Sequence, residues 1–352
     1  MQKTTLLIPG AAYYLQNHAT SMFLTGSTGT GNGVKGQALN DSNAAAQQWL
    51  LDVYKDSDNV VVYSFVQKGN NARLYLVGTT VEQLVITTLN DAAGWTLTKQ
   101  SNNTFSVVNY NSSTKSLMQD THKSTITVGS SNAIADNEKW QLYLADIEVT
   151  GTLSHIEYGA VSIPATQKTM IDSGTIVNSN ASATVEAGVN ISKNISSTFS
   201  WSLNESLTLG ISDTLTLEGE VGIPLVAEGK VTNATTLTAS TTIGSSQTWT
   251  TTEGVTFTAN MNISVPPNSR ATYNAYVNMA SNITSSFTMY VKIKAKSTTR
   301  NIELTGQQLK TLLEDNGYKG MSSVSVGKNS VKIGLTGSFT GSYGINMEVD
   351  VN

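Results

Sequence analysis

Hydrophobic and polar residues alternate with a period of two through the central part of this chain. From Leu203 to Ile223 every apolar side chain has an odd number, and serine, threonine and glutamate fill even positions. After Pro224 most apolar residues keep odd numbers as far as Ile243. This alternation predicts strands with one apolar and one polar face. The segment 203–243 therefore predicts a long amphipathic β-hairpin, whose apolar residues include Leu209, Ile211, Leu215, Leu217, Val221, Ile223, Leu225, Ala227 and Val231.

The middle of this hairpin carries an apolar cluster, Ile223, Pro224, Leu225 and Val226. Hairpin tips in water normally use Asn-Gly or Asp-Gly, so an apolar tip predicts a turn that is hidden or meets lipid. One hairpin leaves unpaired edges in a membrane, but hairpins from several subunits can close a barrel. Lipid would then contact the odd face, and the lumen would be lined by Glu218, Glu220, Glu228 and Lys230. The alternative is a soluble sandwich, whose inner strand faces are equally apolar.

The first 146 residues contain a threefold repeat. Trp49, Trp95 and Trp140 are separated by 46 and 45 positions, and a loop rich in Asn, Asp and Ala precedes each. Each repeat reads as several short strands separated by turns. Three units of this length predict a β-trefoil with one tryptophan per lobe in its core.

The tryptophan motifs resemble those of the ricin-B-type lectin family, whose lobes carry Gln-x-Trp. The first lobe keeps this signature at Gln47, whereas Ala93 and Glu138 replace the glutamine in the others. The resemblance implies carbohydrate binding by a polar fork and an aromatic plate. The polar candidates are Asp41, Asn43, Gln47, Asp136 and Asn137, and the aromatic candidates are Tyr54 and Tyr110. The alternative is that the Asn and Asp residues cap turns, as they commonly do.

The remainder, from Ile147 to Val351, resembles aerolysin-like β-pore-forming proteins. The stretch WSLNESLTLGISDTLTLEGEVGIPLVAEGKVTNATTLTAS is similar to the pre-stem hairpin of that family, with Pro224-Leu225-Val226 as its core. The stretch around Val265-Pro266-Pro267 resembles the return strand, and LTGSFTGSYGINMEV resembles the closing strands. The resemblance implies an elongated module of long, mostly antiparallel strands that forms pores as an oligomer.

A single helical pattern interrupts the strands near the C-terminus. Between Glu303 and Gly320, Leu309, Leu312 and Leu313 follow helical spacing. Thr305 is a suitable N-cap, and Gly317 is a suitable stop signal. We expect one short helix that packs on the sheet.

Composition narrows the functional classes. The 352 residues include 13% charged residues with a net charge of −4, and no Lys/Arg cluster suited to phosphates occurs, so nucleic acid is not an expected partner. Cysteine is absent and the three histidines lie far apart, so neither a thiolate nor a zinc site is expected. No catalytic constellation of carboxylates or nucleophiles appears. The sequence predicts a non-enzyme without cofactors or metals, although a polysaccharide-degrading enzyme with a trefoil module is a weaker alternative.

The combined expectation is an all-β chain with a trefoil at 1–146 and a pore-forming module at 147–352. The trefoil would bind a cell-surface glycan or glycoprotein receptor, and homo-oligomers would insert a transmembrane β-barrel into the target membrane. The N-terminus shows no convincing signal peptide, so we expect a soluble protein released without one. Haemolytic, insecticidal, nematicidal or defensive roles are each compatible with this mechanism of receptor binding and membrane insertion. The alternative is a non-lytic lectin whose β-rich module is a stalk.

Overall fold

The computed structural model describes residues 2–27, 33–56, 58–84, 93–164, 166–204, 215–227, 230–243, 248–318 and 320–352. The chain divides into two units. Of the described residues, the first contains those within Met1–Gly151, Leu215 and those within Lys292–Ile333, and the second contains those within Thr152–Ser206, Thr216–Val291 and Gly334–Asn352. This division differs from a single boundary after residue 146, because Lys292–Ile333 returns to the unit that holds the trefoil.

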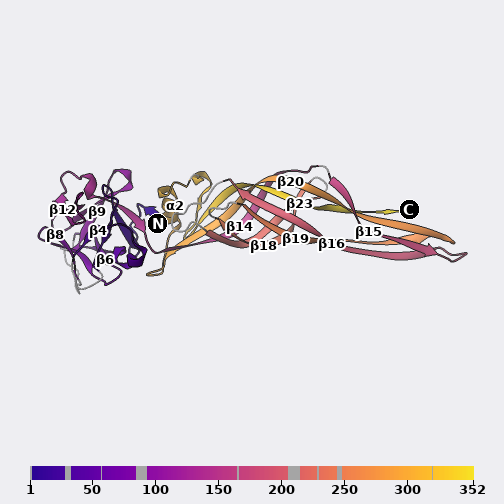
Figure 1. The fold of residues 1–352 in the computed structure, drawn as a ribbon, viewed down its shortest axis with the longest axis horizontal. Helices are drawn as coiled ribbons and strands as arrows, with labels where there is room; N and C mark the ends of the chain where they lie inside the picture. Colours follow the sequence, from indigo (N-terminus) through magenta and orange to yellow (C-terminus); the bar gives the residue numbers. More distant parts are fainter. Residues whose placement is uncertain are drawn as a thin grey trace. The chain divides into compact units, whose positions relative to one another are not determined.

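Six strands of the first unit close a barrel in which each strand pairs with the next and the last pairs with the first. They are β2 (Ala12–Asn17), β5 (Trp49–Lys55), β6 (Val61–Gln67), β9 (Trp95–Lys99), β10 (Phe105–Asn109) and β13 (Lys139–Leu144). Three hairpins complete the lobes: β3 (Phe23–Thr25) with β4 (Lys35–Gln37), β7 (Arg73–Val77) with β8 (Thr80–Leu84), and β11 (Lys115–Gln119) with β12 (Ile126–Ser130). This is the predicted β-trefoil (Figure 1).

The three tryptophans occupy equivalent places in the barrel. Trp49, Trp95 and Trp140 are each fully buried. Each indole Nε1 donates a hydrogen bond to a backbone carbonyl of its own lobe's hairpin, at Leu24 (2.9 Å), Leu74 (3.1 Å) and Leu117 (2.9 Å). A buried indole needs such a partner for its polar N–H. The spacing of the repeat therefore fixes how each hairpin attaches to the barrel.

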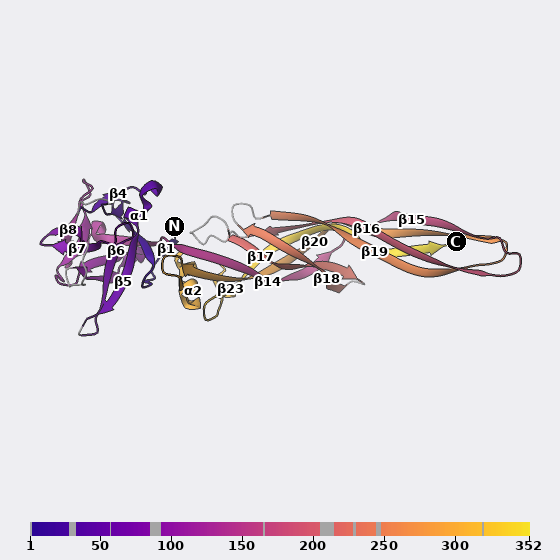
Figure 2. The ribbon, with the colours of Figure 1, turned by 90° about the horizontal axis from the view of Figure 1, so that it is seen from below.

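Long strands form a second sheet, and Figures 1 and 2 show those of the second unit running side by side. They are β14 (Ile147–Ser162), β15 (Thr166–Asn178), β16 (Val185–Leu203), β17 (Leu215–Ala227), β18 (Lys230–Ile243), β19 (Thr248–Val265), β20 (Ser269–Ser297) and β23 (Val331–Val351). The order is β18-β17-β14-β20-β23-β16-β19, with β15 also paired to β20. The pairs β15–β20, β16–β19 and β16–β23 are each antiparallel.

Aromatic side chains fill the core of the second unit. Phe199 and Trp201 of β16 pack against Phe339 of β23, with ring centroids 6.4 and 5.5 Å from that of Phe339. The Trp201 indole donates a hydrogen bond of 2.8 Å to the Tyr158 hydroxyl. Burial raises the pKa of Tyr343 to about 12 and also raises the pKa of Tyr158. Both phenols therefore remain neutral at physiological pH and serve as packing groups.

Short elements complete the first unit. Strand β1 (Gln2–Thr4) pairs with β13, β21 (Ile302–Glu303) pairs with β20, and β22 (Ser325–Val326) pairs with β23. The one-turn helix α1 spans Ala44–Gln47. The 3-10 turns are η1 (Asp41–Asn43), η3 (Ser101–Asn103), η4 (Asp136–Glu138) and η5 (Met321–Ser323).

Helix α2 (Gly306–Asp315) confirms the expected C-terminal helix. Thr305 caps it, accepting from the Gln308 backbone N–H while the Gln308 side chain accepts from the Thr305 N–H. Its apolar face buries Leu309, Leu312 and Leu313. The Asp315 carboxylate accepts from the backbone N–H of Thr5 at 2.5 Å. The helix is thus joined to the N-terminal segment within the trefoil unit.

Replacing the cap tests how much α2 depends on it. Thr305→Ala is expected to destabilise the helix by about 1 kcal/mol, because the Gln308 N–H loses its acceptor. Amide hydrogen exchange of the full chain would show faster exchange in the first turn of α2. Thr311→Ala, within the same helix, is the matched control. Equal protection in Thr305→Ala and the parent would contradict the capping role.

Candidate functional site

The ladder between β16 and β19 organises the predicted hairpin. It runs without a register shift through 18 residue pairs, from Val185 opposite Val265 to Ser202 opposite Thr248. The hydroxyls of Ser202 and Thr248 form a hydrogen bond of 2.6 Å at its end. The chain leaves the ladder at Leu203 and re-enters it at Thr248, so residues 203–247 are an excursion whose two ends are neighbours.

The two faces of this ladder differ in the way that the sequence pattern predicts. Even-numbered residues of β16 and β19 are exposed or half-buried and are mostly Ser, Thr and Asn. Odd-numbered residues of β16 from Ser197 to Leu203 are buried, and Ile263 and Val265 of β19 are buried too. The ladder therefore has a polar outer face and an apolar inner face with the same odd and even numbering as the excursion.

Strands β17 and β18 lie within this excursion and belong to the sheet. In the strand order β17 stands between β18 and β14. The strand β17 ends at Ala227 and β18 begins at Lys230. The expectation that Ile223 to Val226 form the turn is therefore wrong for this structure, because these residues continue β17. Pairing to neighbouring strands gives their backbone groups hydrogen-bond partners, which a turn does not provide.

Most of the predicted hairpin residues fall on these two strands. Those in β17 are Leu215, Leu217, Glu218, Glu220, Val221, Ile223, Pro224, Leu225, Val226 and Ala227, and those in β18 are Lys230 and Val231. Leu209, Ile211 and Glu228 lie outside the described residues. The predicted continuous strand from Leu203 to Ile223 is described only as the end of β16 and the start of β17.

Gln47 has a structural place in the trefoil, which corrects its assignment as a sugar ligand. It is 1% exposed. Its amide oxygen accepts from the Asn40 N–H, and its amide nitrogen donates to the Thr25 hydroxyl at 3.1 Å and to the Ala38 carbonyl. All of these partners belong to the first lobe, so the amide anchors the hairpin β3–β4 to the barrel.

The third lobe repeats this anchor with a carboxylate. Glu138 is buried, accepts from the hydroxyl of Ser116 in β11, and accepts from the Ala135 N–H at 2.8 Å. In the second lobe the equivalent residue is Ala93, which is fully buried. The position two residues before each tryptophan is thus interior in all three lobes. The Gln-x-Trp signature therefore indicates the fold and does not by itself indicate a sugar site.

The other polar candidates lie at turns near the surface. Asp41 and Asn43 lie in η1, and Asp41 is exposed. Asp136 is exposed and forms an ion pair of 2.8 Å with Lys139, and the hydrogen bond from Lys139 lowers the pKa of Asp136. The amide of Asn137 donates to the Gln119 carbonyl at 3.1 Å. These contacts show turn-stabilising roles for Asp136 and Asn137.

The aromatic candidates occupy two different surroundings. Tyr110 donates a hydrogen bond to the Asp56 carboxylate, which lowers the pKa of Asp56. Tyr54 lines a cleft with Asp52, Arg73 and other residues of the first unit. Asp56 could not be recognised as a candidate from the sequence, because an aspartate in a turn commonly caps that turn. Asp56 does so here: the carboxylate oxygen that does not bind Tyr110 accepts from the backbone N–H groups of Asp58 and Val60.

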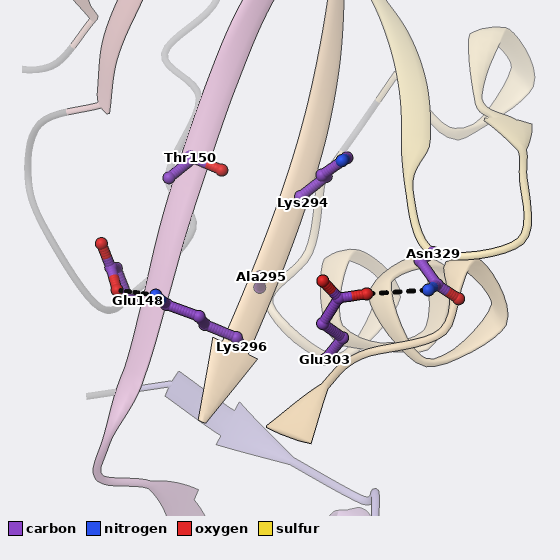
Figure 3. Close-up of a pocket in the computed structure, with 7 residues that line it drawn as sticks. All are labelled: Glu148, Thr150, Lys294, Ala295, Lys296, Glu303 and Asn329. Carbon is purple, nitrogen blue, oxygen red and sulfur yellow. Dashed lines mark hydrogen bonds and ion pairs between the residues drawn. The ribbon is translucent and has the colours of Figure 1, made fainter. Parts of the chain in front are cut away.

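A second cleft of the first unit holds paired charges (Figure 3). Lys296 forms an ion pair of 3.1 Å with Glu148, and the Asn329 amide donates to Glu303 at 2.8 Å. Among the described residues no group of three His, Asp or Glu side chains is suited to a metal ion. In the same part of the chain no helix is long and apolar enough to cross a membrane.

No protein-family model matches this chain, and no curated protein matches it either. Solved structures resemble parts of it. The Mpp75Aa1.1 β-pore-forming protein from Brevibacillus laterosporus is similar over 68% of this chain and 78% of its own, at 17% identity and a TM-score of 0.38. The Rhizoctonia solani agglutinin is similar over 40% of this chain and 99% of its own, at 17% identity and a TM-score of 0.33.

A GlcNAcα1-4Gal-releasing endo-β-galactosidase from Clostridium perfringens is similar over 39% of this chain, at 15% identity and a TM-score of 0.35. This chain spans only 33% of the length of that protein. Because every one of these TM-scores lies below 0.5, none of the similarities assigns a function. The closed barrel with three hairpins and the sheet of long, mostly antiparallel strands give this chain an all-β architecture that begins with a β-trefoil.

Proposed function

We propose that this chain is a pore-forming toxin that attaches to cells through its trefoil and inserts a β-barrel built from the hairpin β17–β18. Subunits bound to the target surface assemble into a ring. Each contributes one hairpin, so neighbouring hairpins satisfy the edge hydrogen bonds that one hairpin leaves open. The activity needs no catalytic group, and we propose no enzymatic reaction.

The observation that carries this proposal is the position of the hairpin within the β16–β19 ladder. The excursion, residues 203–247, starts and ends next to the paired residues Ser202 and Thr248 of a regular ladder. Residues 215–231 alternate between apolar odd positions and largely polar even positions. A segment that leaves and re-enters one ladder can extend that ladder without moving its ends. The extended strands would present one apolar face, as a lipid-facing barrel wall requires.

The trefoil supplies the proposed attachment to glycans. Its surface turns carry carboxylates such as Asp41 and Asp136, and Tyr110 beside Asp56 offers an aromatic ring next to an acid. Groups of this kind recognise sugar hydroxyls and the apolar faces of sugars. Several weak sites on one trefoil would bind a glycan-covered surface together with increased avidity.

Leakage assays test this function directly. We expect the protein to release dye from erythrocytes, to form an SDS-resistant oligomer, and to be blocked by one free sugar. Liposomes and insect gut cells, each with and without protease pretreatment of the protein, would show which membrane and which trigger are required. Binding without leakage under all of these conditions would overturn the proposal in favour of a lectin with a β-rich stalk. Release of reducing sugar from polysaccharides would instead revive an enzymatic role.

A further inference from the structure

The cleft that Tyr54 lines is built from two distant parts of the first unit. Strand β5 contributes Tyr54 and its two preceding residues, and β7 contributes Arg73. Arg300 and Ile302 come from the segment Lys292–Ile333, which lies outside the trefoil sequence. The cleft has a volume of about 290 Å³, close to the lower end of the range of small-molecule sites. It therefore suits one small ligand, such as a single sugar residue.

Two guanidinium groups and one carboxylate face this cleft. Asp52 Oδ2 accepts from Nη2 of Arg73 at 2.9 Å, and Asp52 Oδ1 accepts from Nη1 of Arg300 at 2.9 Å. Arg73 also donates to the hydroxyl of the buried Ser64 at 2.9 Å. No other charged residue is among the described residues that line the cleft. One carboxylate neutralises one of two cations, so the cleft keeps a positive charge, and both guanidinium groups have further N–H donors for an anion.

The position of Arg300 is set by its neighbours before any ligand arrives. The preceding residue, Thr299, donates its backbone N–H to the Asp146 carboxylate at 3.1 Å. A Cβ atom at Gly10 would lie 2.7 Å from Ile302 Cδ1 and 3.0 Å from Arg300 Cδ, so a larger residue there would displace both side chains. Gly10 also has a φ of +81°, which favours glycine. A side chain that is already in place reduces the entropy cost of binding.

The segment that supplies Arg300 is itself basic. Lys292–Ile333 contains eight of the 21 Lys and Arg residues of the chain and three of its 25 Asp and Glu residues, although the whole chain has a net charge of −4. A local excess of positive charge raises the concentration of anions near the cleft.

The rest of the lining suits more than a bare anion. Val53, Tyr54 and Ile302 offer apolar surface, of the kind that packs on the C–H face of a sugar ring. The Asp52 carboxylate has lone pairs beyond its two arginine contacts, so it can also accept from sugar hydroxyls. A simple inorganic anion would use neither group.

We propose that this cleft binds an acidic sugar residue, whose carboxylate accepts hydrogen bonds from Arg73 and Arg300 and whose hydroxyls donate to Asp52. The planar guanidinium group matches the geometry of a carboxylate. This inference rests on the proposed attachment to glycans and names the chemical class of the glycan. Because Arg300 and Ile302 complete the site, residues 1–146 alone do not contain it.

Titrations of the full chain with matched sugars test the site. Ligand-observed NMR would compare methyl glucuronide with methyl glucoside, methyl galacturonide with methyl galactoside, and sialyllactose with lactose. Arg300→Gln removes the charge and most of the donors, whereas Arg300→Lys keeps the charge and loses the planar fork. Arg270→Gln, at an exposed position of the second unit, is the matched control. Circular dichroism would establish that each variant is folded, and Arg300→Lys decides the question if Arg300→Gln is not.

We expect at least one acidic sugar to bind about tenfold more tightly than its neutral counterpart, because hydrogen bonds between charged groups are the stronger ones. Arg300→Gln should remove this preference, Arg300→Lys should keep only part of it, and Arg270→Gln should keep all of it. Equal affinities within every pair, or a preference that both Arg300 variants retain in full, would overturn the site. Acetate or inorganic phosphate that binds as tightly as the acidic sugar would overturn the assignment to a sugar.

The outcome is separable from that of the pore function, since the titrations need no membrane. Leakage from erythrocytes without any preference for acidic sugars would overturn this site and leave the pore function intact. Binding of an acidic sugar by a protein that releases no dye from any of the tested membranes would support the site and overturn the pore function.

Discussion

Replacing Leu217 with lysine is expected to abolish leakage while leaving the soluble fold and cell binding intact. Leu217 is eight positions before Leu225, which at about 3.3 Å per residue and about 45° of tilt places it roughly 19 Å from the tip, near the middle of the bilayer. Lysine on the lipid face there costs about 2–4 kcal/mol. Each subunit bears that cost, so insertion falls by roughly 30- to 700-fold per subunit.

Thr216→Lys is the matched control, since it adds the same charge at the adjacent position on the opposite face. A lumen lysine remains in water, so we expect this variant to keep releasing dye and to shift ion preference toward anions. Circular dichroism and cell-binding assays would establish that both variants are folded and attach to cells. Equal leakage from Leu217→Lys and the parent would show that the odd face of β17 does not meet lipid.

Asp146→Ala is expected to loosen the attachment of the segment Lys292–Ile333 to the trefoil. The Asp146 carboxylate is 7% exposed and accepts from the Ala12 N–H at 3.0 Å, the Ser297 hydroxyl at 2.6 Å and the Thr299 N–H at 3.1 Å. Removing it leaves three donors without that acceptor. We expect a loss of about 4 kcal/mol in the free energy of unfolding of the first unit, since each unpaired buried donor costs roughly 1–3 kcal/mol.

Urea unfolding followed by intrinsic tryptophan fluorescence would measure this loss, because Trp49, Trp95 and Trp140 are buried in the first unit. Asp146→Asn keeps the side-chain volume and one acceptor oxygen and should lose less. Asp58→Ala removes an exposed carboxylate and should change the stability by less than about 0.5 kcal/mol. Equal unfolding midpoints for Asp146→Ala and Asp58→Ala would contradict the anchoring role of Asp146.

Features set by local sequence could be predicted well. The even spacing of Trp49, Trp95 and Trp140 indicated three lobes, and each indole lies in the same structural position. Thr305 and the leucine spacing indicated α2, and the capping box is present. In both cases the contacts that determine the structure join residues within one repeat or one helix. The spacing of these residues along the chain is therefore enough to predict the contacts.

The reversal of the hairpin could not be predicted in the same way. A period of two specifies faces, but it does not specify which strand becomes the neighbour. Pairing of β17 with β14 is a long-range contact, and β17 continues through Pro224, where turn propensity favours a reversal. Local preference and sheet pairing therefore disagree at this stretch.

The sugar candidates show a third situation. Gln47 and Glu138 carry polar groups that suit a ligand, and both are interior anchors. A Gln or Glu two positions before a core tryptophan looks the same in the sequence whether it binds a sugar or anchors the interior. Burial separates the two roles, and burial depends on how the hairpins close over the barrel.

The discontinuous composition of the first unit has a consequence for limited proteolysis. Met1–Gly151 and Lys292–Ile333 belong to one compact unit although they are far apart along the chain. A protease cut at Gly151–Thr152 severs the only backbone that joins Met1–Gly151 to the rest of the chain, but the hydrogen bonds of Asp146 with Ser297 and Thr299 and of Thr5 with Asp315 do not depend on that peptide bond. A nicked chain should therefore keep its trefoil in native buffer and lose it only under denaturing conditions.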